Sequence, residues 1–241
     1  MPNRLSCLSA LFLLLTISLL AAAPASGQIA IDVTIARDQG STSTTVATPA
    51  FSTSSPNELL LAFISADNTG STNTTVTNVA GGGLSWSLVK RTNTQLGTAE
   101  IWSAFASSTL SAVTVTATLS QNVDSSLTVM SFSGVNTSGA VGAVGTGNAN
   151  PGAPTASLVT TGSNSIVVGV GDDWDNAIAR TLGSGQTLVH QYLAPVGDTY
   201  WVQMLSRPVV LGGTSATIND TGPTRDRYNL SIVEVLPHLA E

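Results

Sequence analysis

The chain has 241 residues, of which 42% are hydrophobic and only 9% are charged, with 14 acidic and 8 basic side chains. A formal net charge of −6 and a single lysine, Lys90, leave no basic patch, which argues against a nucleic-acid partner. Disordered chains are poor in β-branched residues and rich in net charge, and this chain is the opposite. The composition therefore indicates a folded protein that does not bind nucleic acid.

The N-terminus has the pattern of an export signal. Arg4 precedes an apolar run over residues 8–23, and small residues follow at 25–27, which predicts a secretory signal peptide over residues 1–27. The run is short for a membrane span and no second run follows, so we expect no membrane span in the mature chain. Cys7, the single cysteine, leaves with the signal, which excludes disulfides, thiol nucleophiles and cysteine-bound zinc. We therefore expect a bacterial protein that is secreted, extracellular or at the cell surface.

The rest of the chain has the pattern of an all-β protein. Short β-branched runs, separated by Gly, Asn, Asp and Ser, recur roughly every ten residues, and no helical periodicity exceeds about two turns. This spacing predicts an antiparallel two-sheet sandwich of jelly-roll or Ig-like type. The expected strands are residues 29–36, 58–65, 84–90, 99–105, 112–119, 126–133, 140–145, 165–171, 186–192, 199–205, 215–218 and 228–236.

The expected strands form two similar sets. Residues 57–68 match 164–176 in pattern, and a second match places Trp102 over Trp201. Self-similarity of this length indicates either two tandem Ig-like domains or two halves of one larger sandwich. We favour one sandwich over residues 28–237 with pseudo-symmetric halves, about 28–136 and 137–237, followed by a short tail at 238–241.

A family resemblance rests on the order of several segments. The chain resembles a secreted β-sandwich module that occurs, often repeated or beside Ig-like modules, in bacterial extracellular proteins. The resemblance implies a secreted or cell-surface interaction role and supplies no catalytic residues. The segments that carry it are NELLLAFISADN, NVAGGGLSWSLV, TAEIWSAFASS, SFSGVNTSGAVGAVGTGNANPG, NSIVVGVG and YWVQML.

One polar loop is a candidate metal site. Asp172, Asp173 and Asp175 follow the expected strand 165–171, and clustered carboxylates at the end of a sandwich are typical calcium ligands. The alternative is an Asp-rich turn whose side chains bond to their own backbone.

The same loop is a candidate sugar site. Trp174 offers a flat face on which a sugar ring stacks, and Asp175 and Asn176 offer hydrogen bonds to its hydroxyls. The alternative is that Trp174 is a core residue, as expected for Trp86, Trp102 and Trp201.

Catalytic patterns have little support. Glycoside hydrolysis needs two facing carboxylates, and Glu100 on an expected strand is a single glutamate of the kind that is usually solvated. A serine triad needs a histidine with a carboxylate partner, and the sequence indicates no such partner for His190 and contains no G-x-S-x-G motif. We therefore predict a protein that is not an enzyme.

The prediction is a secreted, non-catalytic binding or surface-interaction module, binding carbohydrate or adhering through loops at one end. An extracellular glycan or a surface protein is the expected partner, and calcium is the candidate cofactor. The alternatives are a structural matrix or surface-layer component and, with less support, a polysaccharide-active hydrolase. Self-association of the structural kind would use strand edges such as 29–36 or 228–236.

Overall fold

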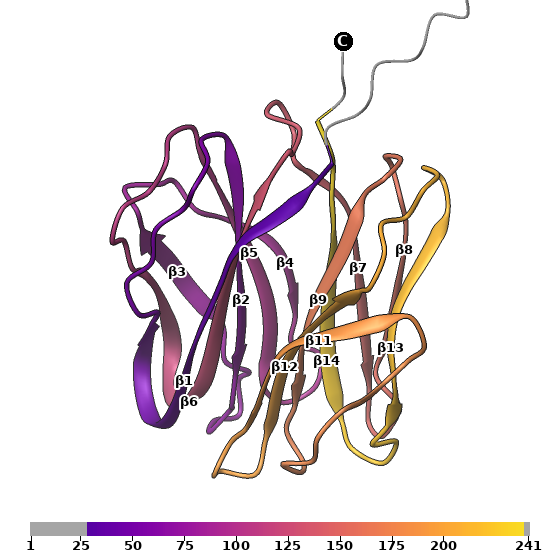
Figure 1. Cartoon of the computed structure of the whole chain (residues 1–241). Coiled ribbons are helices and arrows are strands. Elements are labelled where there is room, and N and C mark those ends of the chain that lie inside the picture. Colours follow the sequence, from indigo (N-terminus) through magenta and orange to yellow (C-terminus); the bar gives the residue numbers. More distant parts are fainter. Residues whose placement is uncertain (1–27, 239–241) are drawn as a thin grey trace, which may run out of the picture.

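The computed structural model describes residues 28–238 and shows an all-β protein (Figure 1). No helix in this part is long and apolar enough to span a membrane. The expected signal peptide and the end of the expected tail lie outside the described residues. The strands are β1 (Ala30–Ala47), β2 (Glu58–Ala66), β3 (Val76–Gly81), β4 (Ser87–Thr92), β5 (Thr98–Ala106), β6 (Val115–Ser133), β7 (Val141–Ala149), β8 (Thr155–Val159), β9 (Ile166–Asp173), β10 (Thr181–Leu182), β11 (Gln186–Leu193), β12 (Thr199–Leu205), β13 (Ser215–Gly222) and β14 (Tyr228–Val235).

The strands form antiparallel sheets, which confirms the predicted all-β sandwich. One large sheet has the order β1-β6-β2-β5-β4, and the other has the order β11-β12-β9-β14-β7. Matched by position, β1, β6, β2, β5 and β4 correspond to β7, β14, β9, β12 and β11. Asn57 and Asn164, which precede β2 and β9, share a left-handed conformation with φ of 59° and 57°. The two large sheets therefore have the same strand order.

The large sheets pack face to face, and each also carries an outer layer (Figure 1). On β2, Leu59, Leu61 and Phe63 face the central core between the large sheets, and Leu60 and Ile64 face an outer core. Every residue of β2, β9 and β14 is buried, because these strands are covered on both faces. This double burial explains the continuous apolar run in β2 after Glu58 and in β9 before its two aspartates. β14 instead buries Asn229, Ser231 and Glu234, whose side chains are hydrogen-bonded within the protein.

The outer layers differ in how the chain builds them. In the first half, β1 and β6 are long strands. Residues 45–47 of β1 pair with residues 116–118 of β6, and β3 pairs with the same part of β6. Register shifts between Gln39 and Thr45 let β1 bend from one layer into the next. In the second half the outer layer is a separate sheet with the order β10-β13-β8.

Several local expectations are corrected. Residues 112–119 and 126–133 belong largely to one strand, β6, and the expected strands do not include β3, β8 and β10. The expectation that residues 228–236 present a free edge is wrong, because β14 lies between β9 and β7. β1 does lie at the edge of its large sheet.

Candidate functional site

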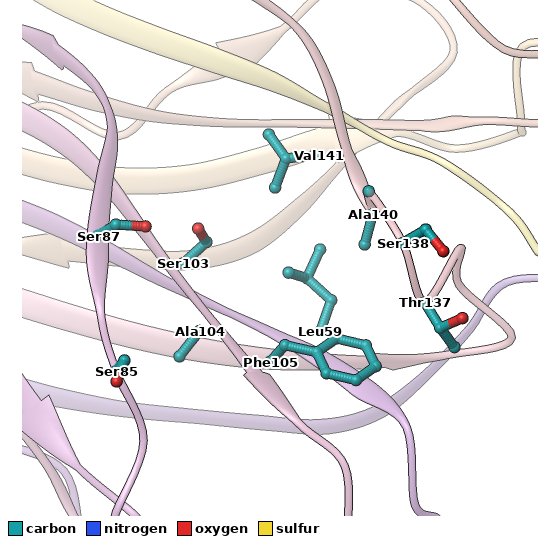
Figure 2. Close-up of a pocket in the computed structure, with 11 residues that line it drawn as sticks. Leu59, Ser85, Ser87, Ser103, Ala104, Phe105, Thr137, Ser138, Ala140 and Val141 are labelled. Carbon is teal, nitrogen blue, oxygen red and sulfur yellow. The ribbon is translucent and has the colours of Figure 1, made fainter.

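A pocket of about 380 Å³ opens between the two halves where β2 begins (Figure 2). Residues of the first half form one side, and the segment that leads into β7 forms the other. The lining residues are Leu59, Ser85, Ser87, Ser103, Ala104, Phe105, Thr137, Ser138, Gly139, Ala140 and Val141.

The pocket wall offers hydroxyl groups and an aromatic ring without any ionisable group. Ser87 and Ser103 are partners in the β4–β5 register, and Figure 2 shows the Ser87 hydroxyl directed toward the interior. Neither hydroxyl has a hydrogen-bond partner among the described residues, and the Ser85 hydroxyl has none there either. Phe105 is 36% exposed, and Leu59 lies in the apolar floor. The wall is therefore suited to an uncharged ligand that carries both hydroxyl groups and apolar faces.

The other end of β2 leads to a cluster of four buried carboxyl groups, which we call the carboxyl cluster. Asp67 and Asp124 come from the first half, and Asp172 and Asp198 come from the second, with exposures of 5% or less. Asp198 accepts a hydrogen bond from the Tyr200 hydroxyl at 2.8 Å, and the charge of Asp67 acts on it. Neither carboxylate oxygen of Asp172 has a hydrogen-bond partner.

Burial and mutual repulsion act together on these carboxyls. Burial, followed by the charges of Asp198, Asp173 and Asp67, raises the pKa of Asp172 well above its ordinary range. Burial and the charge of Asp67 likewise raise the pKa of Asp198 to about 8. The protonated form of Asp198 is therefore favoured at neutral pH, and the shift at Asp172 acts in the same direction.

The structure separates the three predicted metal ligands. Asp172 and Asp173 are successive residues of β9, so they face opposite sides: Asp172 faces the central core, and Asp173 faces the outer core of the second half. Asp173 pairs with Arg180 at 2.7 Å, and Asp175 pairs with Arg227 at 2.8 Å. Within residues 28–238 no group of three or more acidic, histidine or cysteine side chains is arranged to hold a metal ion.

The predicted sugar ligands are engaged within the protein. Trp174 is half-buried, its indole N–H donates to the Asn68 carbonyl at 3.4 Å, and the Arg227 guanidinium lies 5.0 Å from its ring centre. Asn176 is exposed but donates to Asp226 at 2.9 Å. Sugar binding by Trp174, Asp175 and Asn176 stays a prediction.

The two residues considered for catalysis also have structural partners. Glu100 is fully buried, and it accepts hydrogen bonds from Arg91 at 2.7 Å and from the Val76 backbone N–H at 2.7 Å. The expectation of a solvated glutamate is wrong here, because Arg91 on the neighbouring strand neutralises it. His190 lies 2.9 Å from Asp38, across the adjacent edges of the two large sheets.

The chain matches no family model, no curated protein and no solved structure. The pocket and the carboxyl cluster are therefore the basis for assigning a function. Sequence reasoning did not find either one, because each combines residues that are far apart in the chain.

Proposed function

We propose that this protein is a secreted, non-catalytic binding module whose pocket between the two halves takes a neutral carbohydrate. The observation that carries the proposal is the lining itself: free serine hydroxyls and an exposed phenyl ring, with no ionisable side chain. Serine hydroxyls both donate to and accept from sugar hydroxyls, and the ring offers an apolar face to sugar C–H groups. The export pattern of residues 1–27 and the resemblance to bacterial extracellular modules support the secreted setting.

The lining also supports the non-catalytic part of the proposal. General acid–base catalysis needs a titratable group within hydrogen-bond reach of the substrate. Glycoside hydrolysis needs two such carboxyls, and none lines this pocket. The pocket therefore favours recognition over turnover.

Retention of residues 28–241 on a panel of insoluble neutral polysaccharides tests this function. We expect Phe105→Ala to abolish retention and Leu88→Ala to preserve it, since Leu88 is also an exposed apolar residue of this sheet but does not line the pocket. Trp174→Ala tests the loop that the sequence singled out. Retention that survives Phe105→Ala and is lost with Trp174→Ala would move the site to that loop, and no retention on any glycan would reject carbohydrate binding.

A second candidate function is self-association in an extracellular matrix or surface layer. It is favoured by two edge strands, β1 and β8, of which β8 exposes 60% of Val159. Light scattering coupled to size exclusion tests it, because association through β8 predicts oligomers that Val159→Lys disperses. A monomer at every concentration would reject this function.

A further inference from the structure

The carboxyl cluster lies across the contact between the two halves. Asp67 follows β2 and Asp124 lies on β6, whereas Asp172 ends the inner face of β9 and Asp198 precedes β12. Tyr200 links the halves by donating to the Asp124 carbonyl at 3.4 Å as well as to Asp198. The Asp67 and Asp198 carboxyls also act on each other across the contact, and two neighbouring buried carboxyls are compatible only while at least one of them is protonated.

The cluster has no cationic partner of its own. No lysine, arginine or histidine is among the groups that act on Asp172 or Asp198. Burying an ionised carboxylate without a partner is strongly unfavourable, and Asp172 is fully buried with both oxygens unpaired.

The surroundings do not change this charge balance. The β4–β5 loop at 93–97 is uncharged, and Asn229 of β14 donates its side-chain amide to three carbonyls of that loop. Asn229 also acts on Asp172 and lowers its pKa, but burial and the neighbouring charges have larger effects and raise it. On the other face of β9, Asp173 is paired with Arg180. Beyond Asp124 lie Tyr192 and the pair of Asp38 and His190.

We propose that the carboxyl cluster is a proton-dependent lock between the two halves: it holds this end of the central core closed while protonated, and its ionisation loosens the contact. On ionisation, like charges face each other across a buried contact without a cation to balance them. The lock is therefore closed in acidic and neutral surroundings and opens in alkaline ones.

The sign of the pH dependence follows from the direction of the shifts. Folding raises the pKa of Asp198 from 3.8 to about 8, so between these values the folded chain holds more protons than the unfolded chain. The stabilising contribution is complete below about pH 4 and is lost as the pH rises through about 8. Asp172, whose pKa is raised for the same reasons, acts in the same direction.

Thermal melts of residues 28–241 between pH 5 and pH 9 test the lock. We expect the wild-type Tm to fall by roughly 5–10 °C over this range. Asp198→Asn keeps an acceptor for Tyr200 and supplies a permanent N–H toward Asp67, so we expect a flatter profile and a higher Tm than wild type at pH 9. Asp175→Asn is the matched control, because this half-exposed aspartate outside the cluster should leave the slope unchanged.

Infrared difference spectroscopy of the wild-type protein provides a readout that does not depend on a variant. A protonated, buried carboxyl has its own carbonyl band, which we expect at pH 6, absent at pH 10 and weaker in Asp198→Asn. Absence of the band at pH 6, or equal pH slopes for wild type and Asp198→Asn, would overturn the proposal. A Tm that rises with millimolar calcium at pH 8 in wild type but not in Asp172→Asn would overturn it too, since the cluster would then be a cation site.

Discussion

The two ends of the central core are built from opposite chemistry. Near its start, β2 places Leu59 in the floor of an open pocket whose serine hydroxyls have no partner among the described residues, and it leads to Asp67 in a closed cluster of buried carboxyls. In the pocket lining the hydroxyl groups are accessible and uncharged, so solvent or a ligand satisfies them. At the carboxyl end, titratable groups are withdrawn from water, and other parts of the chain satisfy or neutralise them. The difference teaches that charged groups in this protein are mostly used within the fold, whereas the pocket keeps free hydrogen-bonding groups, which is the basis of the binding function proposed above.

The largest expected effect contrasts two phenylalanines. Phe63 is 1% exposed in the central core, and Phe105 is 36% exposed at the pocket. We expect Phe63→Ala to lower the free energy of unfolding by about 3–5 kcal/mol, because it leaves a cavity between two packed sheets. Phe105→Ala should lower it by only about 1 kcal/mol, because much of the ring is already in water. Denaturant titration followed by tryptophan fluorescence measures both, and equal losses would contradict the view that Phe105 belongs to a binding surface.

The next effect concerns the two ion pairs beside the carboxyl cluster. Both side chains of the Arg180–Asp173 pair are fully buried, whereas those of the Arg227–Asp175 pair are about one-quarter exposed. We expect Arg180→Met to cost about 3 kcal/mol of unfolding free energy, because Asp173 loses its only ion pair in a buried place. Arg227→Met should cost about 1 kcal/mol or less. Denaturant midpoints at pH 7 measure both losses of stability. If Arg180→Met left the free energy of unfolding unchanged, Asp173 would be readily protonated once its partner is removed.

A third effect measures how tightly the carboxyl cluster is packed. Gly97 has a φ of +81°, and a Cβ at this position would collide with the Asp172 carboxylate. Gly185 has a similar φ of +73°, but a Cβ there would meet nothing within 4 Å. We expect Gly185→Ala to cost about 1–2 kcal/mol through backbone strain alone, and Gly97→Ala to cost at least about 1 kcal/mol more. If Gly97→Ala and Gly185→Ala lowered Tm equally, the carboxyl cluster would be loosely packed enough to accommodate the added methyl group.

Much of the fold could be predicted from the sequence because its signals are local. β-branched runs bounded by turn residues are short-range patterns, and they identified the positions of most strands. The continuously apolar run at Leu59–Leu61 also indicated a strand buried on both faces. The expectation of two sheets alone did not include the outer layers that cover the second face. β10 was missed because it has only two residues, and β8 was missed because its alternation extends over only five residues, most of them small or polar.

The pairing of residues between the halves was less predictable because self-similarity does not define register. The sequence match places Trp102 over Trp201, but Trp201 lies opposite Gly171 and Trp102 lies opposite Ala62. Gly171 corresponds to Ile64, and the partner of Ile64 is Glu100. The equivalence of the two tryptophans is therefore wrong, and Glu100 occupies the position that Trp201 has in the second half.

The candidate sites could not be predicted, because neither of them is local. Asp67, Asp124 and Asp198 are single acids in separate parts of the chain, and only sheet packing brings them to Asp172. Asp172 and Asp173 suggested one site as neighbours in sequence, but the alternation of a strand sends them to different cores. Pocket serines have no distinguishing pattern in a chain rich in serine.

The smallest expected effect on stability is also the sharpest test of the difference between the ends. Ser103 lines the pocket with a free hydroxyl, whereas the Ser231 hydroxyl donates to the Ala99 carbonyl at 2.8 Å in the buried region near the carboxyl end. We expect Ser231→Ala to cost about 1–2 kcal/mol of unfolding free energy, because it leaves a buried acceptor without its partner. Ser103→Ala should change stability by less than about 0.5 kcal/mol, since no contact within the protein is lost.

For glycan binding the order should reverse. Loss of one hydrogen bond to a ligand weakens affinity by about tenfold, so Ser103→Ala should raise the Kd for a retained glycan by about that factor while Ser231→Ala leaves it unchanged. Calorimetric titration of both folded variants makes the comparison. If Ser231→Ala alone weakened binding, the recognition surface would have to lie at the carboxyl end, and the free hydroxyls of the pocket would have no role in it.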